Sequence, residues 1–437
     1  MNIAPYPTYQ PSGVEWLGNI PKDWSVKRLK WSVDGCFNGV WGDETDGIDD
    51  VVCLRVADFN RDNYTISTEA LTLRAIEAKQ LESRKLKRGD LLIEKSGGGE
   101  KQLVGCVVYF DHEFDAVCSN FVARMPVAEG HLPRYWAYVH AGLYAGKLNY
   151  PAIKQTTGIQ NLDAALYLDT LAAYPPLAEQ QQIAAFLDWK TSQIDALIAK
   201  KQALLQKLKE KRLAVITQAV TKGLNPDAPM RDSGIAWLGK VPAHWGVKRL
   251  KFVAHVGNGS TPNREDSAYW DGGTYPWLNS SVVNQEQVTN ADQFVTPLAL
   301  SECHLPRISP PAVLVGITGQ GKTRGMATTL LFEATINQHL AYVKPDEAKA
   351  SVGFLRRVFD MAYAHLRIES ENGGSTKGAI TCEQIAELPI PVPPLDEQVV
   401  ISERIDMALA KLARMSDNAK SAITRLTEYR SALITAA

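Results

Sequence analysis

Apolar side chains recur in alternating steps of four and three residues through the last segment of the chain, from about residue 395. The positions are Ile401, Ile405, Ala408, Leu412, Met415, Ala419, Ala422, Leu426, Tyr429 and Leu433. A 4-3 spacing sustained over ten positions is typical of a coiled-coil helix, because it keeps one apolar stripe on one side. The pattern therefore predicts a long C-terminal helix that packs against another helix.

A second helical segment, from about 177 to 220, lacks Pro and Gly and is rich in Ala, Leu, Lys, Gln and Glu. Paired prolines precede its first turn and are followed by the acidic residue Glu179, and Gly223 suits the position after its last turn. The matched seam is Ile183, Leu187, Lys190, Ile194, Leu197, Lys201, Leu204, Leu208, Lys211 and Val215. Because three lysines interrupt this stripe, we expect the helix to pack through a broader apolar face that includes Ile198 and Leu205.

The two helical segments belong to an internal repeat. "SGVEWLGNIPKDWSVKRLK" (12–30) returns as "SGIAWLGKVPAHWGVKRLK" (233–251), with 12 of 19 positions identical. "PPLAEQQQI" (175–183) returns as "PPLDEQVVI" (393–401). Equal length and matched phase favour two helices packed on each other, although each could instead dock only on its own domain. The repeat therefore predicts two halves related by a pseudo-two-fold axis. The halves share their first and last segments, and the interior between those segments differs in sequence.

Both interiors mix strand and helix patterns. The segments 89–110 and 271–284 contain short Val-, Ile- and Tyr-rich runs split by Gly and Pro, which predicts strands and tight turns. The segments 133–148 and 352–367 have helical patterns. The expected fold is α+β, divided into a first domain (1–175), a central helix (176–222), a second domain (223–392) and a C-terminal helix (393–437).

"GITGQGKT" (316–323) matches the phosphate-loop pattern G-x-x-x-x-G-K-[ST]. A phosphate loop needs a following helix, whereas β-branched Thr328 and Thr329 favour a second strand. The corresponding segment of the first half, 91–101, keeps the glycine-rich turn without the G-K-T. We therefore interpret 316–323 as a hairpin and keep an NTPase as an alternative that a nucleotide-binding assay would test.

The remaining chemistry is sparse. The net charge is −1, 45% of residues are apolar, and no apolar run suits a membrane span or a secretory signal. Six cysteines are scattered without a C-x-x-C pair, which is typical of reduced thiols in a cytoplasmic protein. Metal-ligand spacings, hydrolase motifs and the methyltransferase N/D-P-P-Y/F signature are all absent from the sequence. These features favour a binding or scaffolding role without bound metal or cofactor.

The doubled layout resembles the specificity subunit of type I restriction–modification systems. The features that carry the resemblance are the opening W-L-G-x-x-P-x-x-W-x-V-K-R-L of each half and the repeated P-P-L-x-E-Q helix. The resemblance implies two target-recognition domains, of α/β type, separated by an antiparallel two-helix coiled coil. It also implies a non-catalytic subunit that binds double-stranded DNA together with two modification (methyltransferase) subunits and, in a complete system, restriction subunits. S-adenosylmethionine would then bind the methyltransferase partner.

Different interiors imply different half-sites, so we expect a split, asymmetric target. A helix of this length spans about 65 Å, and a DNA turn is about 34 Å, so the helix pair is expected to fix the spacer. The alternative of a coiled-coil adaptor that binds no DNA predicts no sequence-selective binding.

Candidate DNA contacts are polar or basic residues on turns, which can reach base edges or phosphates. They are Arg55, Lys95, Ser96, Lys101, Lys154, Gln155, Thr156, Asn279, Ser280, Lys322, Arg324, Ser375, Thr376 and Lys377. The segment 188–222 has eight basic and three acidic residues, which a solvated helix face, phosphate contact or partner docking could explain. The pairs Trp16/Trp24 and Trp237/Trp245 are expected to anchor each domain's first strands.

Overall fold

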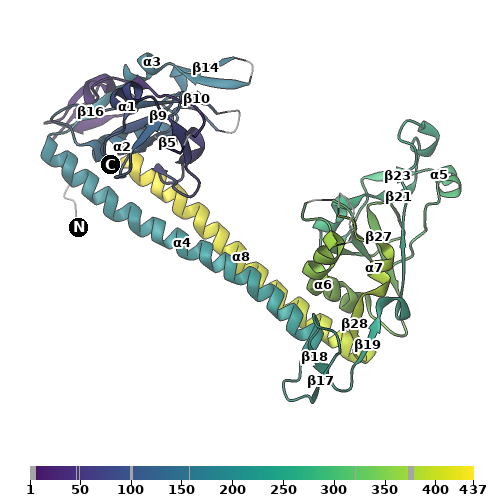
Figure 1. Ribbon diagram of the computed structural model, residues 1–437. Coiled ribbons are helices and arrows are strands. Elements are labelled where there is room, and N and C mark those ends of the chain that lie inside the picture. The colour runs from purple at the N-terminus through teal and green to yellow at the C-terminus, as the bar shows by residue number, and fades with distance from the viewer. Residues whose placement is uncertain are drawn as a thin grey trace. The chain divides into compact units, whose positions relative to one another are not determined.

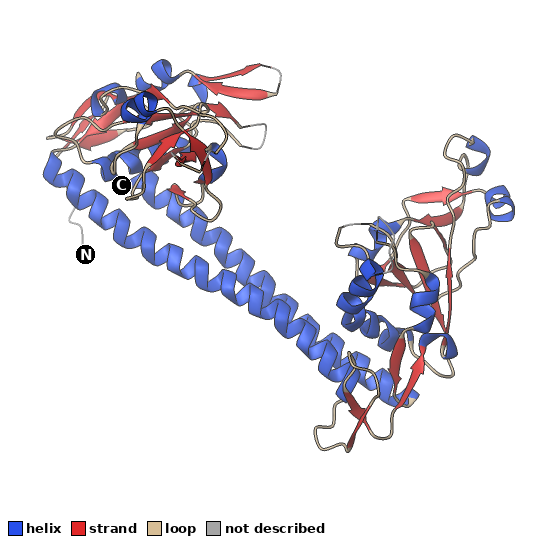
Figure 2. Cartoon of the chain, in the orientation of Figure 1, coloured by secondary structure: helices blue, strands red, loops and turns tan. Residues whose placement is uncertain are grey.

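The computed structural model forms two compact units (Figures 1 and 2). One unit contains residues 1–202 and 420–437, and the other contains 203–419. The described residues are 6–45, 47–48, 50–98, 102–156, 158–319, 321–372 and 378–437. Each long helix is therefore shared between the units, whereas each mixed helix-and-strand domain belongs to one unit.

The first unit is built on an antiparallel sheet of four strands. Their order is β11 (Val107–Tyr109), β9 (Leu91–Glu94), β13 (Val122–Met125) and β4 (Phe37–Asn38). Helix α2 (Pro133–Ala145) covers one face, where Trp136 and Leu143 share a core with Leu91 and Ile93. A second sheet pairs β5 (Asp50–Leu54) with β12 (Ala116–Cys118), in parallel, and with β8 (Thr72–Ala75).

The second unit repeats this topology. Its main sheet has the order β20 (Ala254–Asn258), β27 (Leu340–Pro345), β24 (Ala312–Gly316), β25 (Ala327–Leu330) and β22 (Gln287–Val288). Helix α6 (Val352–Asn372) packs on it through Phe354 and Val358. A second sheet again contains a parallel pair of strands, β21 (Tyr275–Leu278) and β26 (Thr335–Ile336). Strand β23 (Gln293–Val295) pairs with β21 on its other side.

The repeated segments of the sequence close each domain. In the first unit β3 (Ser25–Arg28) pairs with β16 (Leu171–Tyr174), which directly precedes the paired prolines. In the second unit β19 (Gly246–Arg249) pairs in the same way with β28 (Pro389–Val392). The start and the end of each half therefore meet, which explains why these two stretches are the ones that recur.

The remaining described elements are short. They are β1 (Tyr9–Pro11), β2 (Asn19–Pro21), β6 (Phe59–Asn60), β7 (Thr65–Ile66), α1 (Ala78–Arg84), β10 (Ser96–Gly97), β14 (Ile153–Thr156), β15 (Ile159–Leu162), α3 (Ala164–Leu168), β17 (Met230–Asp232), β18 (Lys240–Pro242), α5 (Pro297–Glu302) and α7 (Cys382–Glu387). The 3-10 turns are η1 (Leu29–Ser32), η2 (Val56–Asp58), η3 (Tyr150–Ala152), η4 (Leu250–Phe252), η5 (Ser267–Tyr269) and η6 (Ser280–Asn284).

Helices α4 (Leu177–Lys222) and α8 (Leu395–Ala436) are the two predicted long helices. In the first unit Leu187 near the start of α4 packs with Ile434 near the end of α8. In the second unit Ile216 near the end of α4 packs with Ile401 near the start of α8. The helices are therefore antiparallel and packed on each other, which confirms the interpretation from matched length and phase.

The buried face of α8 differs from the predicted seam. Ile401, Ile405 and Ala419 are buried as expected, but Met415 and Tyr429 are exposed. A strict 4-3 repeat averages 3.5 residues per turn, whereas a straight helix has 3.6, so the buried stripe drifts to later positions such as Arg430 and Ile434. On α4 the drift is similar: Leu197 is exposed, while the expected contributors Ile198 and Leu205 are half-buried.

The P-P-L-x-E-Q motif fixes each long helix to its domain. Trp24 donates its indole N–H to Oε2 of Glu179 at 2.6 Å, and Trp245 donates to Oε2 of Glu397 at 3.0 Å. The next residue of the motif is a buried glutamine. Gln180 accepts the Leu132 N–H at the start of α2 at 2.9 Å, and Gln398 accepts the Ser351 N–H at the start of α6 at 2.9 Å. Glu and Gln at these positions therefore satisfy buried donors.

The expectation that the tryptophans anchor the first strands in the domain cores is confirmed for the pair of the second unit. Trp24 is half-buried against Glu179, Trp245 lies in the core, and Trp237 packs at its edge with its ring stacked on His365. Trp16 is exposed instead.

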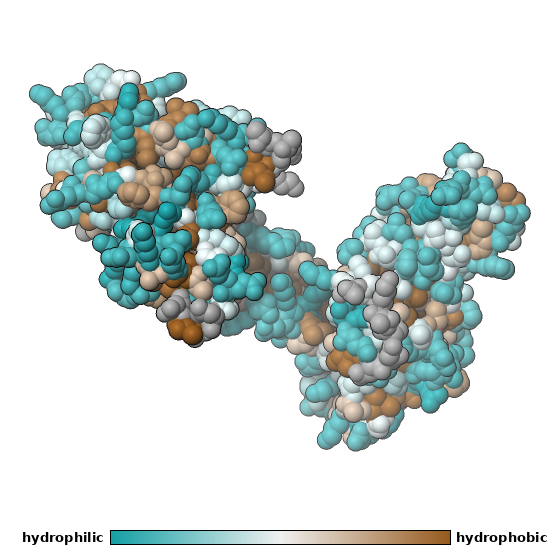
Figure 3. Space-filling model, turned by 45° about the horizontal axis from the view of Figure 1, so that its top comes forward, coloured by the Kyte–Doolittle hydropathy of each residue, from teal (hydrophilic) through white to brown (hydrophobic). Residues whose placement is uncertain are grey.

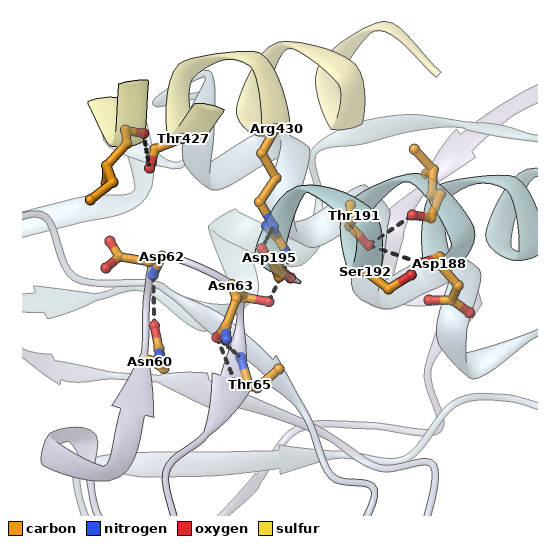
Figure 4. A network of polar contacts seen from close by, with 12 residues as sticks. Asn60, Asp62, Asn63, Thr65, Asp188, Thr191, Ser192, Asp195, Thr427 and Arg430 are labelled. Carbon is orange, nitrogen blue, oxygen red and sulfur yellow. Dashed lines mark hydrogen bonds and ion pairs between the residues drawn. The ribbon is translucent and has the colours of Figure 1, made fainter. Parts of the chain in front are cut away.

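A half-buried arginine in the first unit and a buried arginine in the second join the long helices to the domains. In the first unit Arg134 of α2 pairs with Asp188 of α4 at 2.6 Å, and in the second unit Arg357 of α6 pairs with Asp406 of α8 at 2.6 Å. Asp188 and Asp406 occupy equivalent positions of the repeat. Figure 4 shows a further contact in the first unit, where Arg430 reaches α4 and the loop between β6 and β7.

Candidate nucleic-acid interface

The glycine-rich turn of the first unit lies in a small sheet with the predicted contact residues Lys154 and Gln155 of β14. Ser96 on β10 stands opposite Asn161 on β15, which stands opposite Lys154 on β14. Cross-strand partners share a face of a sheet, so these three polar side chains form one row. Lys154 and Asn161 are exposed, and Lys154 also pairs with Asp163 at 2.8 Å. No feature of the sequence marks Asn161 as a contact, because its exposure depends on the register of the hairpin.

Other predicted residues of the first unit are held by local contacts. The Lys95 ammonium donates to Oδ1 of Asn38. Arg55 pairs with Asp58 at 3.1 Å and caps the turn η2, so its guanidinium is already paired. Gln155 is exposed on β14.

A buried ion pair lies beneath the glycine-rich turn of the first unit. Glu94 at the end of β9 has no exposed surface and pairs with Arg61 at 2.9 Å. Burial raises the pKa of Glu94, and Arg61 offsets only part of that effect. A side chain at Gly97 would approach Oε1 of Glu94 to 3.0 Å, so the turn closes tightly over the carboxylate. Sequence reasoning did not identify this pair, whose partners are far apart in the chain.

The segment 316–323 is a hairpin connection, as predicted. β24 and β25 pair antiparallel, with Val315 opposite Ala327, and a strand rather than a helix follows Thr323. The backbone of the turn is fastened to α6, because Tyr363 donates to the Lys322 carbonyl at 2.9 Å. The helix N-terminus that a phosphate loop requires is thus replaced by a strand.

The two basic residues of this turn differ in exposure. Lys322 is exposed, and its ammonium is available to a ligand. Arg324 is 4% exposed, pairs with Glu371 at 2.6 Å and donates to the Gly378 carbonyl at 2.8 Å. The structure therefore places Arg324 inside the domain, where it holds the turn rather than presenting a cation at the surface.

Asn279 follows β21 and caps the turn η6, where its side chain accepts the Ser281 N–H at 2.9 Å. Ser280 begins that turn and is half-buried. Lys101, Ser375, Thr376 and Lys377 lie outside the described residues, as does the side chain of Thr156. The contact predictions for them stay predictions.

Over the described ranges no group of His, Cys, Asp and Glu could hold a metal ion, and no helix is long and apolar enough to cross a membrane. The face in Figure 3 is mostly hydrophilic, with scattered apolar patches. A duplicated pair of domains on two shared helices, with polar turns at their surfaces, defines a two-site binding protein.

Known proteins share this organisation. The family model described as "Type I restriction modification DNA specificity domain" matches residues 242–424. The putative type I restriction enzyme MjaX specificity subunit of Methanocaldococcus jannaschii is 23% identical over 394 residues, which cover 89% of this chain and 87% of that protein. The EcoKI specificity subunit of Escherichia coli K12 is 23% identical and covers 79% of this chain and 74% of its own.

Solved structures give the same fold. A chain from work on complex assembly and conformational transition of the type I R-M system matches with a TM-score of 0.70, 16% identity and coverage of 95% of this chain and 97% of that chain. The HsdS subunit from Thermoanaerobacter tengcongensis matches with a TM-score of 0.53, 16% identity and coverage of 95% and 96%. The chain is similar to type I restriction–modification specificity subunits over most of its length, and these matches support a role in DNA sequence recognition.

Proposed function

We propose that each of the two domains reads one half of a split, asymmetric DNA target. The observation that carries the proposal is the duplication itself: β4–β13–β9–β11 and β20–β27–β24–β25 have the same order, yet their connecting turns differ in sequence. One scaffold presented twice with unlike turns suits two unlike half-sites. Base edges would be read by turn residues, and phosphates would be held by exposed basic residues such as Lys322.

We further propose that the chain positions two modification subunits and contributes no catalytic group. Several large apolar side chains are exposed at equivalent positions of α4 and α8. These pairs are Leu177 and Leu395, Trp189 and Met407, and Leu197 and Met415. A patch that occurs twice on one chain favours two copies of one partner over a single partner. The methyl donor S-adenosylmethionine would be held by those partners, and restriction subunits would join the full assembly.

The test is to express the chain with its cognate methyltransferase and map adenine methylation across the genome. We expect one motif with two different half-sites separated by a fixed number of unspecified bases. Absence of sequence-specific methylation, or a palindromic motif, would contradict the proposal. The isolated chain, incubated with S-adenosylmethionine or ATP, is expected to turn over neither, and measurable turnover would contradict the non-catalytic role.

A further inference from the structure

A four-residue turn follows the second strand of the parallel pair in both units. In the first unit it comprises Ser119–Val122, with the Val122 N–H donating to the Ser119 carbonyl at 3.0 Å. In the second unit it comprises Asn337–Leu340, with the Leu340 N–H donating to the Asn337 carbonyl at 3.3 Å. We name these two segments the tip turns. The parallel pairs that support them are also equivalent, since Cys118 stands opposite Leu54 and Ile336 opposite Leu278.

In each unit a glycine lies so close to the strand residue before the tip turn that almost no space separates the two backbones. The Val40 N–H donates to the Cys118 carbonyl at 2.7 Å, and the Ser260 N–H donates to the Ile336 carbonyl at 3.1 Å. A Cβ at the preceding glycine would lie 2.0 Å from the Cys118 carbonyl oxygen for Gly39, and 1.7 Å from that of Ile336 for Gly259. Only glycine allows this approach, so the backbone of both tip turns is fixed by the same device.

The glycine-rich segments join each tip turn from the other side. The Lys95 N–H donates to the Phe121 carbonyl at 2.8 Å, and the Ile317 N–H donates to the His339 carbonyl at 3.0 Å. Each tip turn is thus held by backbone contacts beside the turns that sequence analysis selected for DNA contact. The main chain of the tip turns is equivalent in the two units down to individual hydrogen bonds.

The side chains at the centre of the tip turns differ between the units and are exposed. The first unit presents Asn120 and Phe121, and Phe121 is 58% exposed. The second unit presents Gln338 and His339, also exposed. Within the part of the chain that the structure describes, the Asn120 amide makes no hydrogen bond, while the Thr261 hydroxyl donates to Oε1 of Gln338. A side-chain amide therefore stands at the same place on both scaffolds.

We propose that Asn120 and Gln338 each read the edge of an adenine, one in each half-site. A primary amide can donate to adenine N7 and accept from adenine N6–H₂, which makes Asn and Gln the side chains that fit adenine in the major groove. A fixed backbone with an exposed amide gives the orientation that such a two-point contact requires. The neighbouring side chains, Phe121 and His339, differ in polarity, so the bases beside each adenine should differ. The inference rests on the proposed function and names its specificity residues.

The experiment uses the full chain assembled with its modification subunits. Asn120→Ala and Gln338→Ala are made separately, and the methylated motif of each is mapped. Each variant is expected to make one adenine position degenerate in one half-site while the other half-site and the spacer stay unchanged. Discrimination at that position should fall about 5- to 150-fold. Gln202→Ala, which removes an exposed amide on α4, is the matched control and should leave the motif intact.

A second measurement isolates the hydrogen bond to N7. Duplexes carrying 7-deazaadenine at the affected position should bind the wild-type complex more weakly, and the Ala variant should show no further loss. An unchanged motif, or degeneracy at a position other than adenine, would overturn the inference while a split wild-type motif upholds the proposed function. If an Ala variant methylates nothing, Asn120→Gln and Gln338→Asn decide: rescued adenine methylation supports base reading, and failure of the amide exchange overturns it.

Discussion

Arg430 of α8 donates from Nε to Oδ1 of Asp195 on α4 at 3.0 Å (Figure 4). The same guanidinium donates from a terminal nitrogen to the Asn63 carbonyl at 3.0 Å, in the loop between β6 and β7. One buried side chain therefore joins both long helices to the first domain. In the second unit the equivalent residue, Arg212 of α4, pairs with Glu286 at 3.4 Å, in the loop before β22. Each domain is held by both helices. The contact from arginine to domain recurs in the second unit, whereas Ala413 stands at the position equivalent to Asp195, so the ion pair between the helices does not.

Replacing Arg430 with Ala should destabilise the first unit by about 2 kcal/mol, because it removes two hydrogen bonds of a charged donor. Asp195 is partly exposed and can be rehydrated, which limits the loss. Urea unfolding followed by circular dichroism measures the effect. Arg425→Ala removes an exposed arginine from the same helix and should change stability by less than about 0.5 kcal/mol. Equal effects of the two variants would contradict the structural role of Arg430.

Trp245→Phe should destabilise the second unit by about 1–2 kcal/mol, since the ring remains apolar but the N–H donated to Glu397 is lost. Trp16→Phe is the comparison, because Trp16 lies in the corresponding repeat but is exposed. Its unfolding free energy should stay within about 0.5 kcal/mol of the wild type. A larger loss for Trp16→Phe than for Trp245→Phe would show that the motif tryptophans are not anchored as described.

Lys322→Ala should affect DNA binding, whereas Arg324→Ala should affect the stability of the fold. Lys322 is exposed, so its replacement should weaken DNA binding at all sequences and lower the slope of log affinity against log salt by about 1, with stability unchanged. Arg324 is buried against Glu371, so its replacement should lower the melting temperature. Salt-dependent binding titrations and thermal unfolding measure the two effects. An unaltered salt slope for Lys322→Ala would remove this lysine from the interface.

Stability of the first unit should fall with acidification through His140. This residue is fully buried beside Tyr167, 2.6 Å from its hydroxyl, and burial lowers the pKa of His140 to about 3. The unfolded chain takes up this proton near pH 6.5 while the folded chain does not, so stability is lost as the pH falls from about 6.5 toward 3. The contribution approaches about 1.4 kcal/mol per pH unit.

Urea unfolding across that pH range measures the slope, and His140→Gln should flatten it. His304→Gln, which replaces an exposed histidine, should retain the wild-type slope. An identical slope for His140→Gln and the wild type would assign the acid sensitivity to other groups.

Matched insertions in the two long helices should change the spacer of the DNA target alone. Seven residues added to α4 after Gln202 and seven added to α8 after Ala419 keep the helical phase to within about 20°. They lengthen the pair by about 10 Å, equivalent to about three base pairs. Methylation mapping should show a longer spacer between the original half-sites. Altered half-site bases with the original spacer would contradict this division of roles.

The sequence was sufficient to predict the parts of the fold that are repeated or strongly periodic. The two long helices, their mutual packing, the strands around residues 91 and 312, and the hairpin at 316–323 all follow from pattern and spacing. The predicted buried positions of α8 were wrong at Met415 and Tyr429. A strict 4-3 count ignores the drift of the buried stripe around a straight helix.

The candidate site was predicted less completely. Turn residues could be selected by type, but their burial depends on partners that are distant in sequence. Arg324 is the clearest case, since Glu371 and Gly378 enclose it. Asn120 and Gln338 lie at corresponding positions of the matched stretches 114–125 and 332–343. Sequence did not select them as contacts, because their exposure and the equivalent hydrogen bonds around Gly39 and Gly259 are visible only in the structure.

The crowding at Gly39 and Gly259 has a practical consequence for protein engineering. Backbone contacts set the path of the tip turns, while Asn120, Phe121, Gln338 and His339 sit outside the cores. A combinatorial library confined to those four codons should yield mostly folded variants, whereas randomising either glycine should yield few. Selection from such a library would be an economical route to enzymes that modify new sequences.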